Sequence, residues 1–192
     1  MPVDREIEEL TRQIEELKGK LSEARRRRPP EPVADHTLLS QDGETVTLSA
    51  LFGDKDDLFV IHNMGKGCSY CTMWADGFVS ALPHLQDRAA FVVVSPDEPE
   101  VQRAFAASRG WTFPMASGAG GEFIRAMGFD HGESGSHDYW PGISAFHRNP
   151  DGSIVRTGKD VFGPGDDYCP PWRMFDLLEG GAGDWEPKTS YS

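Results

Sequence analysis

The chain has 192 residues and a formal net charge of −12. This length accommodates one globular domain of ordinary size together with an appendage. The acidic balance argues against a nucleic-acid surface, because phosphate binding needs basic patches. No apolar run approaches the roughly 20 residues that span a bilayer, and no secretory signal is visible. We therefore expect a cytoplasmic protein that binds neither nucleic acid nor membrane.

Residues 1–30 predict an amphipathic, coiled-coil-like helix over residues 4–28 and the start of a linker. Its apolar positions recur at alternating spacings of three and four residues: Ile7, Leu10, Ile14, Leu17 and Leu21. Such spacing is typical of the a and d positions of a heptad repeat. Asp4 is a candidate N-cap, and Pro29 begins the stiff linker. Barely three heptads are marginal alone, so the stripe packs either on its own domain or on a second chain. We favour a second chain, and hence a homo-oligomer, in the simplest case a dimer.

Residues 31–192 are predicted to form one α/β domain. The first half is expected to contain strands over 37–39 and 45–48, a helical turn over 48–53, a buried strand over 58–61, a helix over 68–87 and a strand over 90–95. A helix over 98–109, capped by Asp97, a strand over 113–115 and a helix over 122–127 should follow. The remainder should form a mobile loop over 128–139, a hairpin of 143–147 with 153–156, and a helix over 172–178. Gly77 and Pro83 predict a kink or an early end in the first long helix. This order predicts an α/β sandwich whose mixed central sheet is flanked by helices.

The segment after the central strand carries the clearest chemical signal. Gly65 permits a tight turn, and Cys68 and Cys71 then fall where the next helix begins. At a helix N-terminus, free N–H groups and the helix dipole stabilise a thiolate, and Lys66 adds a positive charge nearby. We therefore assign Cys68 as the candidate nucleophile and Cys71 as the resolving thiol. A strand, a glycine turn and a Cys-x-x-Cys helix are typical of thioredoxin-type redox sites.

Several blocks of sequence point to one family. They are His62–Gly65, Cys68–Thr72, Trp74–Phe78, Arg109–Trp111, Gly142–Ser144 with Phe146, Phe162–Asp167 and Trp185–Lys188. With them, nearly the whole chain resembles the bacterial thioredoxin-like family catalogued as domain of unknown function 899. The resemblance implies a thioredoxin-like domain over residues 31–192, and it supplies no settled activity or substrate.

The sequence departs from thioredoxins and from peroxiredoxins, and both differences limit the activity that we expect. Thioredoxins place a cis-proline opposite the cysteine pair, whereas Gly142 or Ile143 falls there in this chain, with Pro141 only nearby. This argues against thioredoxin-like handling of protein disulfides. Peroxiredoxins carry Pro-x-x-x-Thr/Ser-x-x-Cys, whereas here Gly65 lies three residues before Cys68 and no proline precedes it at the matching place. We therefore do not expect a standard peroxiredoxin.

Four further side chains each have two interpretations. His62 lies where thioredoxins place a buried aspartate that relays protons, so it is either a catalytic relay or a strand-end histidine bonded to backbone. Tyr70 either faces a substrate or fills space. Asp76 either assists acid–base chemistry or is exposed or paired in a salt bridge. Cys169 is either a third redox thiol or a buried spare cysteine.

Together these residues predict a thiol–disulfide oxidoreductase or thiol-dependent reductase. Its catalytic residues would be Cys68, Cys71 and His62, and it would need no bound cofactor beyond the redox-active Cys68–Cys71 disulfide. Its partners would be an oxidised or disulfide-containing substrate and a cellular dithiol reductant. Two alternatives remain: a zinc site built on Cys68 and Cys71 with Cys169 and a histidine (His131 or His137), and a non-enzymatic binding module of the same fold.

Overall fold

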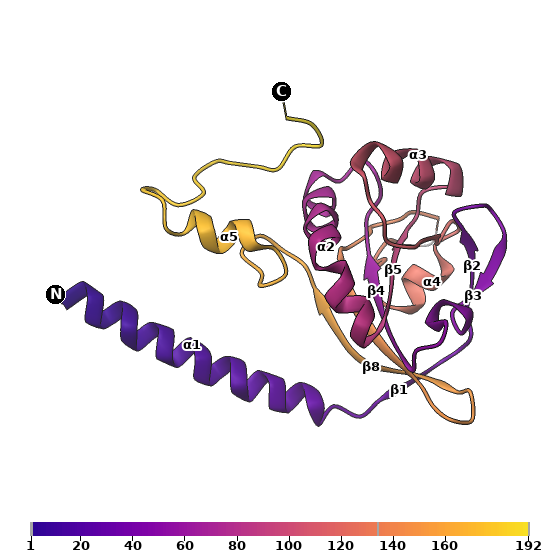
Figure 1. Cartoon of the computed structure of the whole chain (residues 1–192), viewed down its shortest axis with the longest axis horizontal. Coiled ribbons are helices and arrows are strands. Elements are labelled where there is room, and N and C mark those ends of the chain that lie inside the picture. Colours follow the sequence, from indigo (N-terminus) through magenta and orange to yellow (C-terminus); the bar gives the residue numbers. More distant parts are fainter. Residues whose placement is uncertain (1, 134, 192) are drawn as a thin grey trace.

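The computed structural model describes residues 2–133 and 135–191 and contains a mixed sheet with helices on both faces (Figure 1). The elements in chain order are α1 (Pro2–Arg26), β1 (Glu31–Val33), β2 (Thr37–Ser40), β3 (Thr45–Thr47), η1 (Ala50–Phe52), β4 (Asp57–His62), α2 (Ser69–Arg88), β5 (Ala90–Ser95), α3 (Pro99–Arg109), β6 (Met115–Ser117), α4 (Glu122–Ala126), β7 (Gly142–Arg148), β8 (Ile154–Val161) and α5 (Pro170–Phe175). The predicted α/β sandwich with a mixed sheet and an N-terminal helix is confirmed.

The sheet has eight strands in the order β1-β8-β7-β4-β5-β6-β2-β3. Strand β4 pairs in parallel with β5 and antiparallel with β7. A parallel pair needs a crossover connection, and α2 supplies it between β4 and β5. Strand β4 therefore lies in the middle of the sheet, and its C-terminal end delivers the chain to the cysteine helix.

Two apolar cores lie on the two faces of the sheet. One core packs α2 and α3 against the face that carries Ile61 and Val93, and it contains Cys71. The other packs α4 and η1 against the face that carries Leu58 and Val60. Alternate residues of a strand point to opposite faces, so neighbouring residues of β4 belong to different cores. This alternation decides the position of His62 described below.

Several element boundaries differ from the sequence prediction. Strand β1 forms inside the expected proline linker, because an edge strand tolerates Pro32 and pairs with β8 on one side only. Helix α5 begins at Pro170, where proline is favoured in the first helical turn, and it ends at Phe175. Strand β8 extends to Val161, beyond the expected end at residue 156.

The two long helices of the domain also differ in detail from the expectation. Helix α2 runs to Arg88 with Pro83 inside it, so it does not end early. Glu98, in place of Asp97, occupies the N-cap position of α3. The backbone N–H of Lys66 donates a hydrogen bond to the Asp97 carboxylate at 2.7 Å. Asp97 therefore stabilises the turn that precedes the cysteines.

The segment 128–139, expected to be a mobile loop, contains one buried carboxylate that several of its groups contact. Asp130 accepts hydrogen bonds from His137 Nδ1 at 2.8 Å, from Arg125 at 2.9 Å and from the backbone N–H groups of Gly132 and Asp138. These donors hold the pKa of Asp130 well below its usual range, with the His137 bond the largest cause. Residue 134 of this loop lies outside the described residues.

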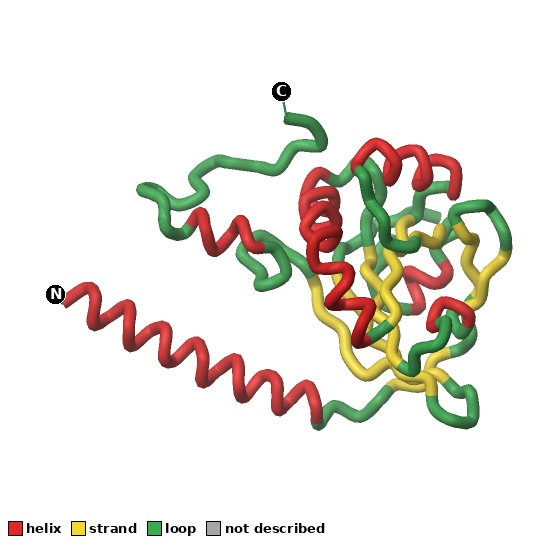
Figure 2. The backbone as a smooth tube through the Cα atoms, in the orientation of Figure 1, coloured by secondary structure: helices red, strands yellow, loops and turns green. Residues whose placement is uncertain are grey.

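Helix α1 projects from the rest of the domain (Figures 1 and 2). It has no buried residue over its length. It begins at Pro2, so Asp4 belongs to its first turn and is not the N-cap. Within residues 2–133 and 135–191, no helix combines the length and apolar character that a membrane span requires.

Candidate redox site

The cysteine helix begins at a turn held by side-chain hydrogen bonds. After β4, the Asn63 side chain accepts a hydrogen bond from the backbone N–H of Gly65 at 2.8 Å. Gly65 has φ of +100°, and a Cβ atom there would lie 3.0 Å from the Asp97 carboxylate oxygens. A glycine is therefore required both by the backbone conformation and by the approach of Asp97. The turn delivers Cys68 to the N-cap position of α2.

Cys68 is poised as a thiolate. Its Sγ accepts a hydrogen bond from the backbone N–H of Cys71 at 3.0 Å, as an N-cap side chain does. The pKa of Cys68 is lowered to about 7, first by a hydrogen bond from the Cys71 thiol and then by backbone N–H groups of Cys71 and Tyr70, while partial burial opposes the shift. Lys66 is not among these causes. A thiol of lowered pKa has more thiolate at neutral pH than an ordinary cysteine, and this favours nucleophilic attack.

Cys71 has the opposite character. It is 2% exposed, and its pKa is raised well above the ordinary range of a thiol. The first cause is its hydrogen bond to Cys68, followed by burial and by the negative charge of Cys68. The backbone N–H of Met64 lies 3.4 Å from its Sγ and stabilises the ionised form. The pair therefore consists of a partly exposed thiol of lowered pKa and a buried thiol of raised pKa, and neither cysteine forms a disulfide.

Aromatic side chains pack together at the start of α2, next to the cysteine pair in the sequence. The Tyr70 ring stacks on Trp172 of α5 with centroids 6.1 Å apart, and it lies 6.2 Å from Trp74. The Trp74 indole N–H donates to Asp166 at 3.4 Å. Asp166 also accepts from the backbone N–H groups of Gly163 and Tyr168. These contacts tie the C-terminal segment to the start of α2, which the sequence pattern did not indicate.

A groove of about 500 Å³ lies beside Tyr70. Its lining residues are Tyr70, Pro164, Gly165, Trp172, Asp176, Ala182, Gly183, Asp184, Trp185 and Glu186. Three of these side chains are aromatic and three are carboxylates, and the described lining includes no lysine or arginine. The groove is therefore lined by both aromatic and acidic side chains, and one of its lining residues, Tyr70, follows Cys68 by two positions in the sequence.

His62 lies apart from the cysteine pair, on the opposite face of the sheet. It is 2% exposed, its ring stacks on Phe129 with centroids 3.9 Å apart, and its Nε2 hydrogen-bonds to Ser144 Oγ at 2.9 Å. Its pKa is lowered to about 3, first by burial and then by the charges of Arg156 and Lys159. The structure thus brings Cys68 and Cys71 together and does not bring His62 to them.

Asp76 is paired in a salt bridge. Its carboxylate binds the Arg109 guanidinium through two contacts and accepts the Trp111 indole N–H at 2.8 Å. These bonds join α2 to the end of α3. The partners explain why an acidic residue lies between buried residues in the middle of α2, and the salt-bridge interpretation of Asp76 is confirmed.

Cys169 lies in the core that contains Cys71, and it is 2% exposed. Burial, with the nearby charges of Asp166 and Asp76, raises its pKa to about 11. A protonated, buried thiol is a weak nucleophile, so the structure favours the spare-cysteine interpretation.

The zinc alternative requires ligands that converge on Cys68 and Cys71. The described part of the chain contains no group of three or more His, Cys, Asp and Glu side chains arranged to hold a metal ion. His137 is occupied by Asp130, and His131 packs edge-on against Trp140 with centroids 5.3 Å apart. Both histidines considered as zinc ligands therefore contact residues of their own loop, Asp130 and Trp140.

This sheet order, with a helix and a cysteine pair following the central strand, defines a thioredoxin-like α/β protein. Similar solved structures are peroxiredoxins: peroxidoxin BcpB from Mycobacterium tuberculosis (TM-score 0.57, 24% identity, 69% of this chain and 84% of that chain), reduced Prx3 in complex with H2O2 from Vibrio vulnificus (0.57, 15%, 71% and 88%) and peroxiredoxin Q from Xanthomonas campestris (0.51, 25%, 66% and 82%). These likenesses show the fold.

The chain belongs to the family described as "Bacterial protein of unknown function (DUF899)", whose model matches residues 4–190. The resemblance noted from the sequence is thereby confirmed. A comparison with curated proteins gave no match.

Proposed function

We propose that this protein is a thiol–disulfide oxidoreductase, or more broadly a thiol-dependent reductase, in which Cys68 attacks the substrate and Cys71 releases it. The observation that carries the proposal is the N-cap position of Cys68. There its sulfur accepts the Cys71 N–H at 3.0 Å and its pKa falls to about 7. The groove beside Tyr70 supports an approach of the substrate over this end of α2.

In the first step, the Cys68 thiolate attacks one sulfur of a substrate disulfide. A mixed disulfide forms at Cys68, and the other substrate sulfur leaves as a thiolate. This step removes the negative charge of Cys68, and the Cys68 sulfur no longer accepts a strong hydrogen bond from the Cys71 thiol. Two of the causes that raise the pKa of Cys71 thereby disappear, while the Met64 N–H still stabilises its thiolate.

In the second step, Cys71 loses its proton to the departed substrate thiolate, whose pKa is about 8.5 for an ordinary thiol. Cys71 then attacks the Cys68 sulfur, the Cys68–Cys71 disulfide forms, and the second substrate sulfur leaves. A cellular dithiol supplies two electrons and two protons to restore both thiols. The cytosol, where we expect the protein, is a compartment that maintains such dithiols.

The test is to trap the intermediate. Cys71→Ser with Cys169→Ser should accumulate a mixed disulfide at Cys68 when given a small disulfide. Cys68→Ser with Cys169→Ser should form none, and the Cys169→Ser single variant should turn over with dithiothreitol as reductant. Mass spectrometry reads each species. Cys68 and Cys71 that remain free thiols at every redox poise would contradict the proposal and favour a binding module without turnover.

A peroxide is the second candidate oxidised substrate, because the similar solved structures are peroxiredoxins and one of them holds H2O2. Attack on a peroxide would give a sulfenic acid at Cys68 and release the alcohol or water. Condensation with Cys71 would then give the same disulfide and release water. Peroxide and disulfide turnover, compared at equal concentration in the Cys169→Ser variant, identify which substrate class reacts faster.

A further inference from the structure

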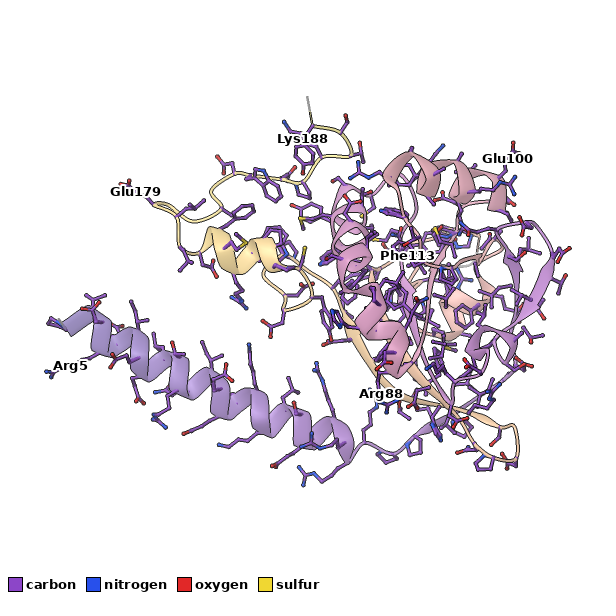
Figure 3. The ribbon with its side chains drawn as sticks, viewed as in Figure 1. Arg5, Arg88, Glu100, Phe113, Glu179 and Lys188 are labelled. Carbon is purple, nitrogen blue, oxygen red and sulfur yellow. The ribbon has the colours of Figure 1, made fainter. Side chains whose placement is uncertain are left out.

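Helix α1 carries an apolar stripe that the rest of the described chain does not cover. The stripe consists of Val3, Ile7, Leu10, Ile14, Leu17 and Leu21. Each of these side chains is between 49% and 62% exposed. Figure 3 shows side chains extending on all sides of α1, with Arg5 near its N-terminal end. A contiguous stripe of large apolar residues on a projecting helix is typical of an interaction surface.

Helix α1 is attached to its domain by salt bridges and a short linker, with none of its residues buried. Arg25, near the C-terminal end of the helix, pairs with Asp160 of β8. Pro29 and Pro30 follow, and β1 then pairs with β8 from Glu31. Nearer the N-terminus of the helix, Lys18 forms a salt bridge to Asp167 of the domain at 3.2 Å. A short, stiff connection thus attaches α1 to the domain while the stripe remains exposed.

We infer that the stripe binds the same stripe of a second copy of this chain, and that the two α1 helices run antiparallel. This inference does not depend on the proposed cysteine chemistry. In heptad terms, Ile7, Ile14 and Leu21 are a positions, and Val3, Leu10 and Leu17 are d positions. An antiparallel pair places a positions opposite d positions in every layer.

One register pairs all six stripe residues of each helix. With Leu10 opposite Ile14 of the second copy, Ile7 meets Leu17 and Val3 meets Leu21. The arrangement has two-fold symmetry, so each contact occurs twice. The salt bridges of Arg12 with Glu9 and Glu16 lie on the outer face of the helix and are compatible with it.

The charges that flank the stripe select the antiparallel orientation. In that register Glu6 lies opposite Lys20 of the second copy, and by the two-fold symmetry this charge pair forms at both ends of the seam. The flanking positions of a helix pair set its orientation through such charge pairs. A parallel pair instead places Lys20 beside Arg25 of the second copy and Glu6 beside Thr11, which gives repulsion and no attraction. The acidic start and basic end of α1 therefore match an inverted copy.

The first experiment measures the molar mass of the full-length protein by light scattering over a range of concentrations. We expect twice the chain mass of 21.2 kDa. Leu10→Asp with Leu17→Asp should give the single-chain mass with unchanged circular dichroism. The matched control, Gly19→Asp with Ser22→Asp, adds the same charge on the outer face, where Gly19 has open space, and should remain a dimer. A monomeric wild type, or an unaffected mass in the leucine variant, would overturn the inference.

The second experiment tests the orientation at low ionic strength, where charge pairs are least screened. Lys20→Glu should weaken dimerisation by about tenfold, because each copy then places the new carboxylate against Glu6 of the other. Adding Glu6→Lys should restore the wild-type dissociation constant. A parallel pair predicts the opposite sign for Lys20→Glu, since the new carboxylate would face Arg25. A tighter Lys20→Glu dimer, or no rescue by Glu6→Lys, would overturn the antiparallel arrangement.

Discussion

The two thiols of the cysteine pair differ in protonation because they occupy different environments at the start of α2. Cys68 is partly exposed and accepts hydrogen bonds, whereas Cys71 is buried and donates one. A shared proton of this kind lowers the pKa of one thiol at the expense of the other. The side chain at position 71 should therefore control the ionisation of Cys68.

A substitution at position 71 tests this coupling. In a Cys169→Ser background, Cys71→Ala should raise the pKa of Cys68 above about 7, because the largest cause of its depression is the Cys71 hydrogen bond. Cys71→Ser retains a donor and should keep the pKa lower than Cys71→Ala does. The pH dependence of Cys68 alkylation by iodoacetamide gives both values. Identical profiles for the two variants would show that backbone N–H groups alone set the pKa.

His62 should make the fold sensitive to acid. Its pKa is about 3 in the folded protein and about 6.5 in the unfolded chain, so the unfolded state binds more protons between these values. The stability that depends on neutral His62 is then fully present only well above pH 6.5, and it falls with decreasing pH, by about 1 kcal/mol between pH 6.5 and pH 5.5 and by about 1.4 kcal/mol per unit below that. Urea unfolding at pH 6.5 and pH 5.5 should show this loss in the wild type and a smaller one in His62→Phe. Equal losses in both proteins would contradict the buried, neutral state of His62.

At the scale of elements, α2 is joined to the end of α3 by Asp76. Its carboxylate holds the Arg109 guanidinium and the Trp111 indole N–H. Hydrogen bonds that involve charged groups contribute more to stability than neutral ones. A residue that clamps two helices should affect unfolding and leave the cysteine chemistry unchanged.

Asp76→Ala should destabilise the protein by about 2 kcal/mol, because it leaves partly buried Arg109 and Trp111 donors without their acceptor. The pH profile of Cys68 alkylation should not change. Asp87→Ala, an exposed position on the same helix, is the control and should have little effect on either measurement. A shifted Cys68 profile in Asp76→Ala would instead assign Asp76 a part in acid–base chemistry.

At the scale of the molecule, the net charge of −12 and the three carboxylates that line the groove both favour cationic over anionic substrates. A negative surface raises the local concentration of cations and lowers that of anions, and salt screens the effect. A disulfide substrate that carries positive charge should therefore reach Cys68 faster than one that carries negative charge.

Cystamine, which is cationic, should react with Cys68 at least about tenfold faster than anionic dithiodipropionate at low ionic strength. The ratio should approach one as salt is added. Asp184→Asn with Glu186→Gln should reduce the ratio more than Glu8→Gln with Glu15→Gln, which removes the same charge from α1. Equal effects of the two double variants would attribute the preference to net charge and not to the groove.

Local chemistry in the sequence was enough to predict much of this protein. Glycine at position 65, the Cys68–Cys71 spacing and the heptad spacing of α1 act within a few residues, so their consequences can be predicted without knowing distant contacts. The same holds for the order of strands and helices, which predicted the fold class.

Contacts between distant segments were decided only by the tertiary structure. Strand β4 is apolar on both faces, so its composition does not indicate which of its residues face α2. Because side chains alternate between the two faces of a strand, His62 lies on the face away from the cysteines. The Trp74–Asp166 bond and the Asp76–Arg109 pair join residues 92 and 33 positions apart. No local pattern encodes such pairs, because they form only when the sheet brings their elements together. The sequence thus determined the cysteine pair and the helix that begins there, and the tertiary structure decided which side chains lie around them.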